Sequence, residues 1–397
     1  MTTSPFRWGR LLPALTIVAS VLPLLLAPVR ARELSPDGRG EFAFFQSSFT
    51  IISTFGALGA RHAYYSLRAA GLPDGQLLGP QAALSAWGAS AFLGLPLFFI
   101  SLTQHSGATT ALIAVAILLG PMHLYVQLQL ARAQYDGRAH RIAITTATPA
   151  VWEFLSNLVL AVANWMMVLS VSLATMAAEL LRAVVSRGSR PVRSSAEDRK
   201  RYTQLLWRYA IVGAMPMLVA NVDVIVYGAL IPQAELGYYV VARLAVTLLV
   251  FGTMVLEGRF VARDGQFART ATIMLSVLAV AALVGGTAGT YLIVPIFGRD
   301  YAPAASIFGV MAAVGFAAGA HLLFSAHAAG RQRNATALTS SVAVFVVTAS
   351  LAVVVALHSA TLAWLALPVG GGYAVGLVIL VVGLRLPPSA APERTAL

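Results

Sequence analysis

The sequence predicts an all-α integral membrane protein with about twelve transmembrane helices. Its composition is 58% hydrophobic and only 11% charged, whereas a soluble chain carries about a quarter charged residues. Apolar runs recur from one end of the chain to the other, and each is close to the ~20 residues that a helix needs to cross a bilayer. Composition and run length therefore predict the same fold class.

The composition also excludes several kinds of function. The chain has no cysteine, so disulfides, thiolate catalysis and cysteine metal sites are impossible. The net charge of +12 invites a nucleic-acid interpretation, but the basic residues lie in short loops between apolar runs, where they set membrane orientation. We expect no nucleic-acid partner, no enzymatic activity, no catalytic residue, and no metal or cofactor site.

Six spans are predicted in the first half of the chain. They cover Leu11–Val29, Phe42–Ala60, Ala83–Leu102, Ala108–Ala131, Ile142–Ala161 and Trp165–Val185. The basic start and the segment Val29-Arg30-Ala31 resemble a signal peptide with its cleavage site. The length of the first apolar run and the hydrophobic helices that follow it favour retention as a first span.

Two polar loops are predicted in this half, and one of its spans contains a proline and a glutamate. Residues 31–44 are predicted to form an outer loop between the first two spans, and a short basic loop with Arg61 follows the second. Pro149 and Glu153 interrupt the fifth span, where a proline frees a backbone carbonyl and often marks a kink.

The second half is predicted to hold six more spans after a linker. Residues 186–204 are rich in Arg, Ser and Pro and predict a flexible basic linker in the cytoplasm. The later spans cover Leu205–Leu230, Gly237–Arg259, Ala268–Val294, Pro303–Ala329, Ala335–Leu357 and Thr361–Leu384. The predicted domains are thus an N-terminal bundle 1–185, the linker 186–204, a C-terminal bundle 205–385 and a cytoplasmic tail 386–397.

Loop charge predicts the orientation. With both termini in the cytoplasm, most basic residues fall on the inner side, and the outer segments carry only Arg30, Arg32, Arg39 and Arg299. The prediction is a multi-pass protein of the cell membrane, with some attraction of its inner face to anionic lipids.

A helical hairpin carries the most costly charges of the sequence. Asp223 lies near the end of the seventh span and Arg243 near the start of the eighth, which puts both about 7 Å inside the interface at ~1.5 Å per residue. An ionisable residue within a span needs a partner or a use. Two alternatives stay open: an ion pair that joins the two helices, or an arginine that binds substrate.

A weak two-fold echo relates the two halves, as in transporters built from repeats. Gly40-Glu41-Phe42 opens the second span and Gly237-Tyr238-Tyr239 the eighth. His123 in the fourth span has a counterpart in His321 of the tenth. Both halves would then have six spans and the same orientation.

Three stretches resemble one transporter family. SPDGRGEFAFFQSSF, NVDVIVYGALIPQAELGYYVVARL and IFGRDYAPAASIFGVMA are similar to segments of O-antigen-type polysaccharide flippases in the multidrug/oligosaccharidyl-lipid/polysaccharide (MOP) exporter superfamily. The resemblance implies two six-helix bundles around a central cavity that opens to alternate sides. The span count favours sugar flippases over peptidoglycan-precursor flippases, which look longer.

The resemblance also implies a cargo, a polyprenyl-pyrophosphate-linked oligosaccharide or polysaccharide precursor. The candidate substrate-binding residues are Arg243, Asp223 and Arg61, because guanidinium pairs well with phosphate. Glu153, His123 and His321 are weaker candidates for coupling or gating, with structural hydrogen bonding as the alternative. Expected partners are the lipid-linked sugar, membrane lipids, a coupling cation or proton, and other polysaccharide-assembly proteins.

Other functions fit the same class. A cation-coupled multidrug (MATE-like) exporter would share the fold. A membrane-embedded polymerase or glycosyltransferase fits less well, because such enzymes usually carry a sizeable outer loop and the longest outer connection predicted here is short. A scaffold without transport activity is a further alternative, since fold alone does not establish function.

Overall fold

Helices make up all the regular structure in the part of the chain that the computed structural model describes. The described ranges are 8–71, 78–186, 195–260, 267–331, 333–358 and 361–385. The predicted C-terminal tail and the middle of the predicted linker lie outside these ranges.

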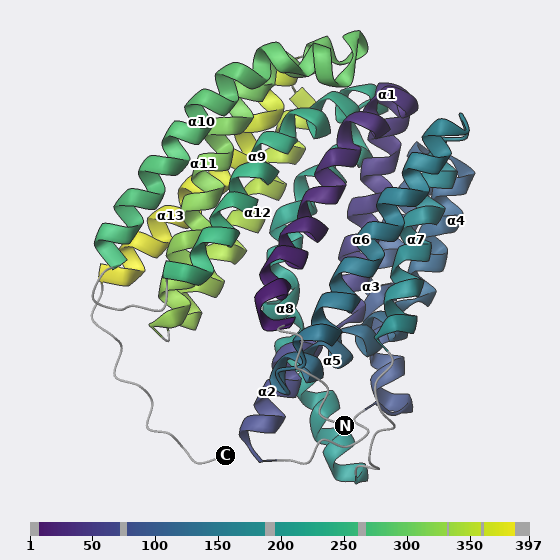
Figure 1. Cartoon of the computed structure of the whole chain (residues 1–397), viewed down its shortest axis with the longest axis vertical. Helices are drawn as coiled ribbons and strands as arrows, with labels where there is room; N and C mark the ends of the chain where they lie inside the picture. Colours follow the sequence, from purple (N-terminus) through teal and green to yellow (C-terminus); the bar gives the residue numbers. More distant parts are fainter. Residues whose placement is uncertain are drawn as a thin grey trace. The chain divides into compact units, whose positions relative to one another are not determined.

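The described helices follow one another with short connections (Figure 1). In chain order they are α1 Trp8–Gly56, α2 Ala60–Ala69, α3 Pro80–Gln104, α4 Gly107–Leu118, α5 Gly120–Tyr135, α6 Ala139–Val162, α7 Val168–Val185, α8 Ala196–Leu230, α9 Gln233–Phe260, α10 Phe267–Phe297, α11 Ala302–Gly330, α12 Asn334–His358 and α13 Leu367–Arg385. The 3₁₀ segments η2 Arg299–Tyr301 and η3 Leu362–Ala366 precede α11 and α13.

The chain is a multi-pass membrane protein by the length and apolar composition of these helices. Nine of the described helices are long and apolar enough to cross a membrane, or ten if α4 and α5, bent by 55°, form one span. The expectation of twelve differs for two reasons. The first two predicted spans lie in α1, which is counted once although it consists of two helices that meet at a kink at Ser35. Helix α6 is not among the ten because Glu153 and Asn157 make it more polar.

The prediction of a non-helical outer loop at residues 31–44 is wrong, because these residues are helical on both sides of a kink at Ser35. Two helices, counted together as α1, meet at Ser35, whose φ of 59° and ψ of 170° are not helical. Phe42 and Phe44 are fully buried, so the segment packs against the interior of the protein. A proline at the next position, Pro36, restricts the backbone of Ser35 and accounts for a break there.

The glycines of the predicted repeat meet at this break. A Cβ at Gly40 would overlap the carbonyl of Gln233, and one at Gly237 would overlap the carbonyl of Pro36. Only glycine allows two backbones to approach so closely. Two of the echoed positions thus hold the start of α9 against α1.

The basic loop predicted at Arg61 is also wrong, because those residues form α2. Ala63, Tyr64 and Leu67 are buried on one face of this short helix, which packs on α5 and α8. The spacing of these apolar residues is helical, and it is the signal that the loop interpretation overlooked.

The end of the predicted linker is helical as well. Ser195 caps α8: its hydroxyl accepts from the Asp198 backbone nitrogen at 3.0 Å, and the Asp198 carboxylate accepts from the Ser195 nitrogen at 3.3 Å. This reciprocal arrangement satisfies two backbone donors and starts the helix. Tyr202 is fully buried. Residues 195–204 are therefore not a flexible strap, and residues 187–194 lie outside the described part.

The structure divides into two compact units. Unit 1 comprises residues 1–241 and 293–304, and unit 2 residues 242–292 and 305–397. The division falls within α9 rather than in the predicted linker. The predicted organisation as two six-helix bundles stays a prediction. In unit 1, α1 contacts α3, α4, α5, α6, α7 and α8, so it forms the centre of that unit.

Candidate functional site

A polar cavity of about 600 Å³ lies inside unit 1. Six helices line it: α1, α2, α5, α6, α7 and α8. Its charged lining residues are Arg61, Glu153, Glu179 and Arg182. Ionisable residues are rare in membrane-embedded helices unless they face a protein interior or a water-filled space. Because four of them line this cavity, it is the candidate functional site.

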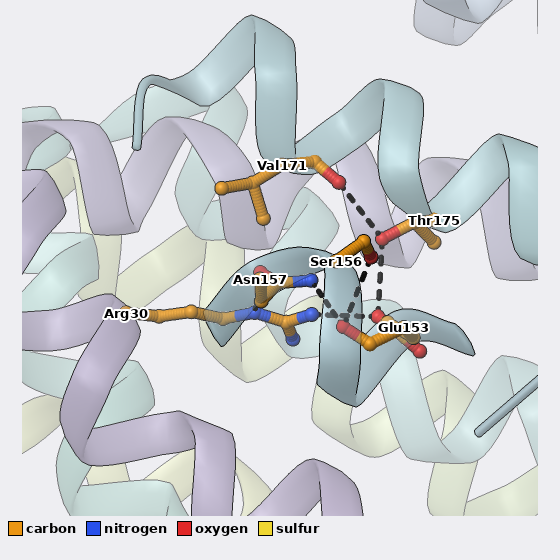
Figure 2. Close-up of polar contacts among 6 residues, drawn as sticks. All are labelled: Arg30, Glu153, Ser156, Asn157, Val171 and Thr175. Carbon is orange, nitrogen blue, oxygen red and sulfur yellow. Dashed lines mark hydrogen bonds and ion pairs between the residues drawn. The ribbon is translucent and has the colours of Figure 1, made fainter. Parts of the chain in front are cut away.

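One part of the cavity wall is formed by Glu153 of α6. Its Oε1 atom accepts hydrogen bonds from Arg30 Nη2 at 2.7 Å and from Thr175 Oγ1 at 3.1 Å. Figure 2 shows Arg30 of α1 reaching Glu153, with Thr175 of α7 on the other side. Arg30 Nε also donates to Asn157 Oδ1 at 3.0 Å, and Asn157 Nδ2 returns a bond to the Glu153 carbonyl at 2.7 Å.

This cluster compensates a buried cation. The Arg30 side chain is only 3% exposed and that of Glu153 15%. The Arg30 guanidinium also lies 4.9 Å from the centre of the Phe42 ring, where the electron-rich face adds attraction. Removing one charge of such a pair costs far more than removing both, because the other is left buried and alone. The cluster therefore joins α1, α6 and α7 firmly.

Arg30 is the residue that the sequence prediction missed. Sequence alone assigns it to an outer segment, since a lone arginine after an apolar run looks like a loop charge. Its partner lies 123 positions further along the chain. The sequence feature that could have indicated a buried arginine was Glu153, because a carboxylate within a span needs a cation within reach.

Glu179 and Arg182 of α7 form a second ion pair on the cavity wall. Arg182 Nη1 lies 2.9 Å from Glu179 Oε1, and the two residues are one helical turn apart. Both residues line the cavity. Every carboxylate on the wall thus accepts from an arginine in this structure.

Arg61 differs from the other cavity arginines. It lies at the start of α2, lines the cavity and is exposed. No ion pair or hydrogen bond of its guanidinium exists within the described residues. Arg61 is therefore a cation with its bonding capacity available in the cavity. Its neighbour His62 stacks on Tyr209, with ring centres 5.9 Å apart.

His123 also faces this cavity. It is 5% exposed, lines the cavity and packs edge-on against Phe49 with ring centres 5.5 Å apart. Its Nε2 atom is buried with no hydrogen-bond partner within the described residues. A buried polar atom without a partner is uncommon and calls for an explanation.

His321, the predicted counterpart of His123, lies in unit 2 in a different environment. The Ser340 hydroxyl donates to the Gly376 carbonyl at 2.9 Å, so at 2.8 Å it accepts from His321 Nε2. This assignment follows from the single hydroxyl proton. His321 thereby connects α11 to α12 and α13.

The hairpin residues lie outside the cavity. Asp223 is 1% exposed and its Oδ2 atom accepts from the Tyr239 hydroxyl at 2.5 Å. Arg243 belongs to unit 2, whereas Asp223 belongs to unit 1. The proposed pairing of Asp223 with Arg243 stays a prediction. Of the six predicted site residues, Arg61, Glu153 and His123 share the cavity.

No cluster of three or more metal-ligating side chains occurs in the part of the chain that the structure describes. The chemistry of the cavity is instead that of arginine, carboxylate, amide, hydroxyl and imidazole groups. Such groups can bind an anion and hydrogen-bond a polar head.

Comparison with known proteins gives a fold but no sequence family. No protein-family model and no curated protein matches the sequence. The lipid II flippase MurJ in an inward closed conformation is similar with a TM-score of 0.71 at 12% identity, covering 95% of this chain and 88% of MurJ. An inward-facing MATE family multidrug transporter of the MOP superfamily gives 0.63 at 12% identity, covering 94% and 97%.

A third similar structure is the MATE multidrug transporter DinF-BH in a ligand complex, with a TM-score of 0.58 at 16% identity, covering 97% of this chain and 96% of that one. These solved structures are a flippase and drug transporters, and the similarity extends over nearly the whole chain. The protein therefore has the all-α fold of MOP-superfamily transporters.

Proposed function

We propose that this protein flips a polyprenyl-pyrophosphate-linked oligosaccharide across the cell membrane by alternating access. The polar cavity of unit 1 receives the sugar diphosphate, and the lipid tail stays in the bilayer. The observation that carries the proposal is the cavity of about 600 Å³ with the unpaired Arg61 on its wall.

The physical reason is the cost of moving an anion through hydrocarbon. An ionised group taken out of water without compensation costs many kcal/mol. A guanidinium offers a fixed charge and several donors that match phosphate oxygens. Because Arg61 has no carboxylate partner within the described residues, an incoming diphosphate does not have to break an ion pair before it binds there.

The second candidate is a cation-coupled drug exporter, which the carboxylates of Glu153 and Glu179 favour. An incoming organic cation would have to compete with Arg30 and Arg182, which already bind these carboxylates at 2.7 Å and 2.9 Å. Among the charged groups of the cavity, the one without an ion-pair partner in the described residues is the cation Arg61, so an anionic cargo fits better. The solved structures of this fold include both kinds of transporter.

A flipping assay in proteoliposomes tests the proposal. The probe is a polyprenyl-pyrophosphate disaccharide with a nitrobenzoxadiazole group on the sugar, and membrane-impermeant dithionite bleaches only the outward-facing label. We expect wild type to expose the whole pool and Arg61→Ala to slow this at least tenfold. Arg208→Ala, an exposed arginine of α8 that does not line the cavity, is the matched control.

Two results would contradict the proposal. One is Arg61→Ala activity equal to that of wild type at equal reconstitution. The other is efflux of a cationic rhodamine dye from loaded liposomes without any flipping of the sugar probe, which would favour the drug exporter.

A further inference from the structure

The cavity wall formed by α1 and α5 carries polar but uncharged groups. We call Gln46, Thr50 and Ser53 of α1 with His123 and Gln127 of α5 the neutral wall; all five line the cavity. Positions 46, 50 and 53 are spaced by four and three residues, so they share one face of α1. Positions 123 and 127 share one face of α5 in the same way, and α1 contacts α5.

The donors of the neutral wall are available. The side-chain amides of Gln46 and Gln127 make no hydrogen bond within the described residues, and His123 Nε2 has no partner there either. The cavity-facing glutamines are half-buried. Two side-chain amides, each able to donate and to accept, thus lie on the cavity wall without a hydrogen bond to any described residue.

The hydroxyls of the neutral wall are acceptors. Thr50 Oγ1 donates to the Gln46 carbonyl at 2.8 Å and Ser53 Oγ to the Thr50 carbonyl at 3.0 Å. Each hydroxyl proton is used within the helix, and each oxygen keeps a free lone pair. The wall therefore offers amide donors next to hydroxyl acceptors.

The charged groups lie on other elements. Arg61 is on α2, Glu153 on α6, and Glu179 and Arg182 on α7. The neutral wall holds no carboxylate and no arginine, and it adds the aromatic ring of Phe49. A site with separate cationic and neutral polar surfaces fits a ligand with the same division.

We propose that the neutral wall binds the hydroxyl groups of an uncharged sugar unit, while Arg61 binds the diphosphate to which it is attached. This rests on the proposed function and adds the chemical class of the head group. A sugar hydroxyl both donates and accepts, which matches amide and hydroxyl groups side by side. A site built to bond a hydroxyl discriminates strongly against a ligand that lacks it, because its own polar groups then stay unpaired.

Equilibrium binding to protein in lipid nanodiscs separates the two claims. Probe A is polyprenyl pyrophosphate without sugar, probe B carries a neutral disaccharide, and probe C carries a uronic acid in place of the first sugar. We expect wild type to bind B more tightly than A or C. Gln46→Leu and Gln127→Leu should each weaken B about fivefold, the value of one net hydrogen bond, and leave A unchanged. Exposed Gln104→Leu is the control.

Each result has a distinct meaning. If wild type binds none of the probes, both the function and the neutral wall are wrong. If wild type binds A and B equally, and the glutamine variants bind B as wild type does, the diphosphate claim stands and the neutral wall is overturned. Equal loss of A and B in well-folded glutamine variants also overturns it.

Discussion

The hollow in unit 1 and the hollow in unit 2 differ in what lines them. The second, of about 400 Å³, lies between α10 and α11, and its lining includes Ala279, Ala282, Leu283, Gly286 and Phe316. Its hydroxyls at Thr287 and Thr290 bond to carbonyls of their own helix at 2.8 and 2.9 Å. The unit 1 cavity instead exposes charges and unpaired amides.

The two echoed histidines show the same difference. His123 keeps a buried nitrogen without a partner among the described residues on the cavity wall, whereas His321 is bonded through Ser340 to Gly376. The two predicted counterparts thus have different surroundings: His123 lines a cavity, and His321 connects three helices. The cavity with a charged and polar lining is therefore the one in unit 1.

The largest expected effect is on the charge cluster that shapes the unit 1 cavity. Glu153→Ala leaves the Arg30 guanidinium buried without its carboxylate, so we expect a loss of about 3–5 kcal/mol in stability. Thermal unfolding in detergent measures this, with exposed Glu235→Ala as the control. The double variant Arg30→Met/Glu153→Leu should recover most of the loss. Equal stability of wild type and Glu153→Ala would contradict the compensating role.

The hairpin residues provide the next test, which concerns transport. Arg243→Lys keeps the charge but loses the planar donor geometry, so transport should be about tenfold slower in a normally folded protein if Arg243 also binds phosphate. Transport equal to that of wild type is expected if Arg61 alone binds the diphosphate. Exchanging the two residues, Asp223→Arg with Arg243→Asp, should restore stability but not flipping if Arg243 binds phosphate. Full flipping by the exchanged protein would instead indicate that the pair only joins helices.

Substitutions of the two histidines should have smaller effects on stability and test the difference between His123 and His321. His321→Leu removes one buried hydrogen bond and should cost about 1 kcal/mol. His123→Leu removes a nitrogen that has no bond within the described residues, so its melting temperature should not fall while binding of the sugar probe weakens. Unfolding and binding measured on both variants check this. A stability loss in His123→Leu as large as that in His321→Leu would contradict the claim that only His321 contributes a stabilising hydrogen bond.

The smallest effect is expected in the linker. Replacing residues 187–194 with a neutral Gly/Ser sequence of equal length should leave folding and flipping within about 0.5 kcal/mol and twofold of wild type. Extending the replacement through Tyr202 should destabilise the protein, because Tyr202 is fully buried in α8. Fluorescence-detected size exclusion and melting curves distinguish the two replacements. Equal melting temperatures for both would contradict a structural role of Tyr202.

Helices were predictable from sequence where the apolar run alone sets their length. The predicted spans Trp165–Val185 and Ala335–Leu357 correspond to α7 Val168–Val185 and α12 Asn334–His358. The helical structure of residues 31–44, on either side of the kink at Ser35, was not predictable in this way, since Arg39, Phe42 and Phe44 are buried there only in the folded protein. Hydropathy does not register such tertiary burial.

The candidate site was predictable in part, where a charged or polar residue stands out against an apolar run. Glu153, His123 and Arg61 stand out as polar residues in or beside spans, and they do share a cavity. Arg30 was missed because its role depends on a contact across 123 positions. The free amides of Gln46 and Gln127 carry no charge and give no hydropathy signal, so only the structure identifies them.

The most direct measurement uses the absence of native cysteine. Thr50→Cys in the unit 1 cavity and Ala282→Cys in the unit 2 hollow are each reacted, in proteoliposomes, with a small water-soluble methanethiosulfonate. We expect fast modification of Thr50→Cys, at least tenfold slowing of that reaction by the polyprenyl-pyrophosphate disaccharide, and no effect of the same probe on Ala282→Cys. Modification of Thr50→Cys at the same rate with and without the probe would contradict the claim that the unit 1 cavity holds the polar head.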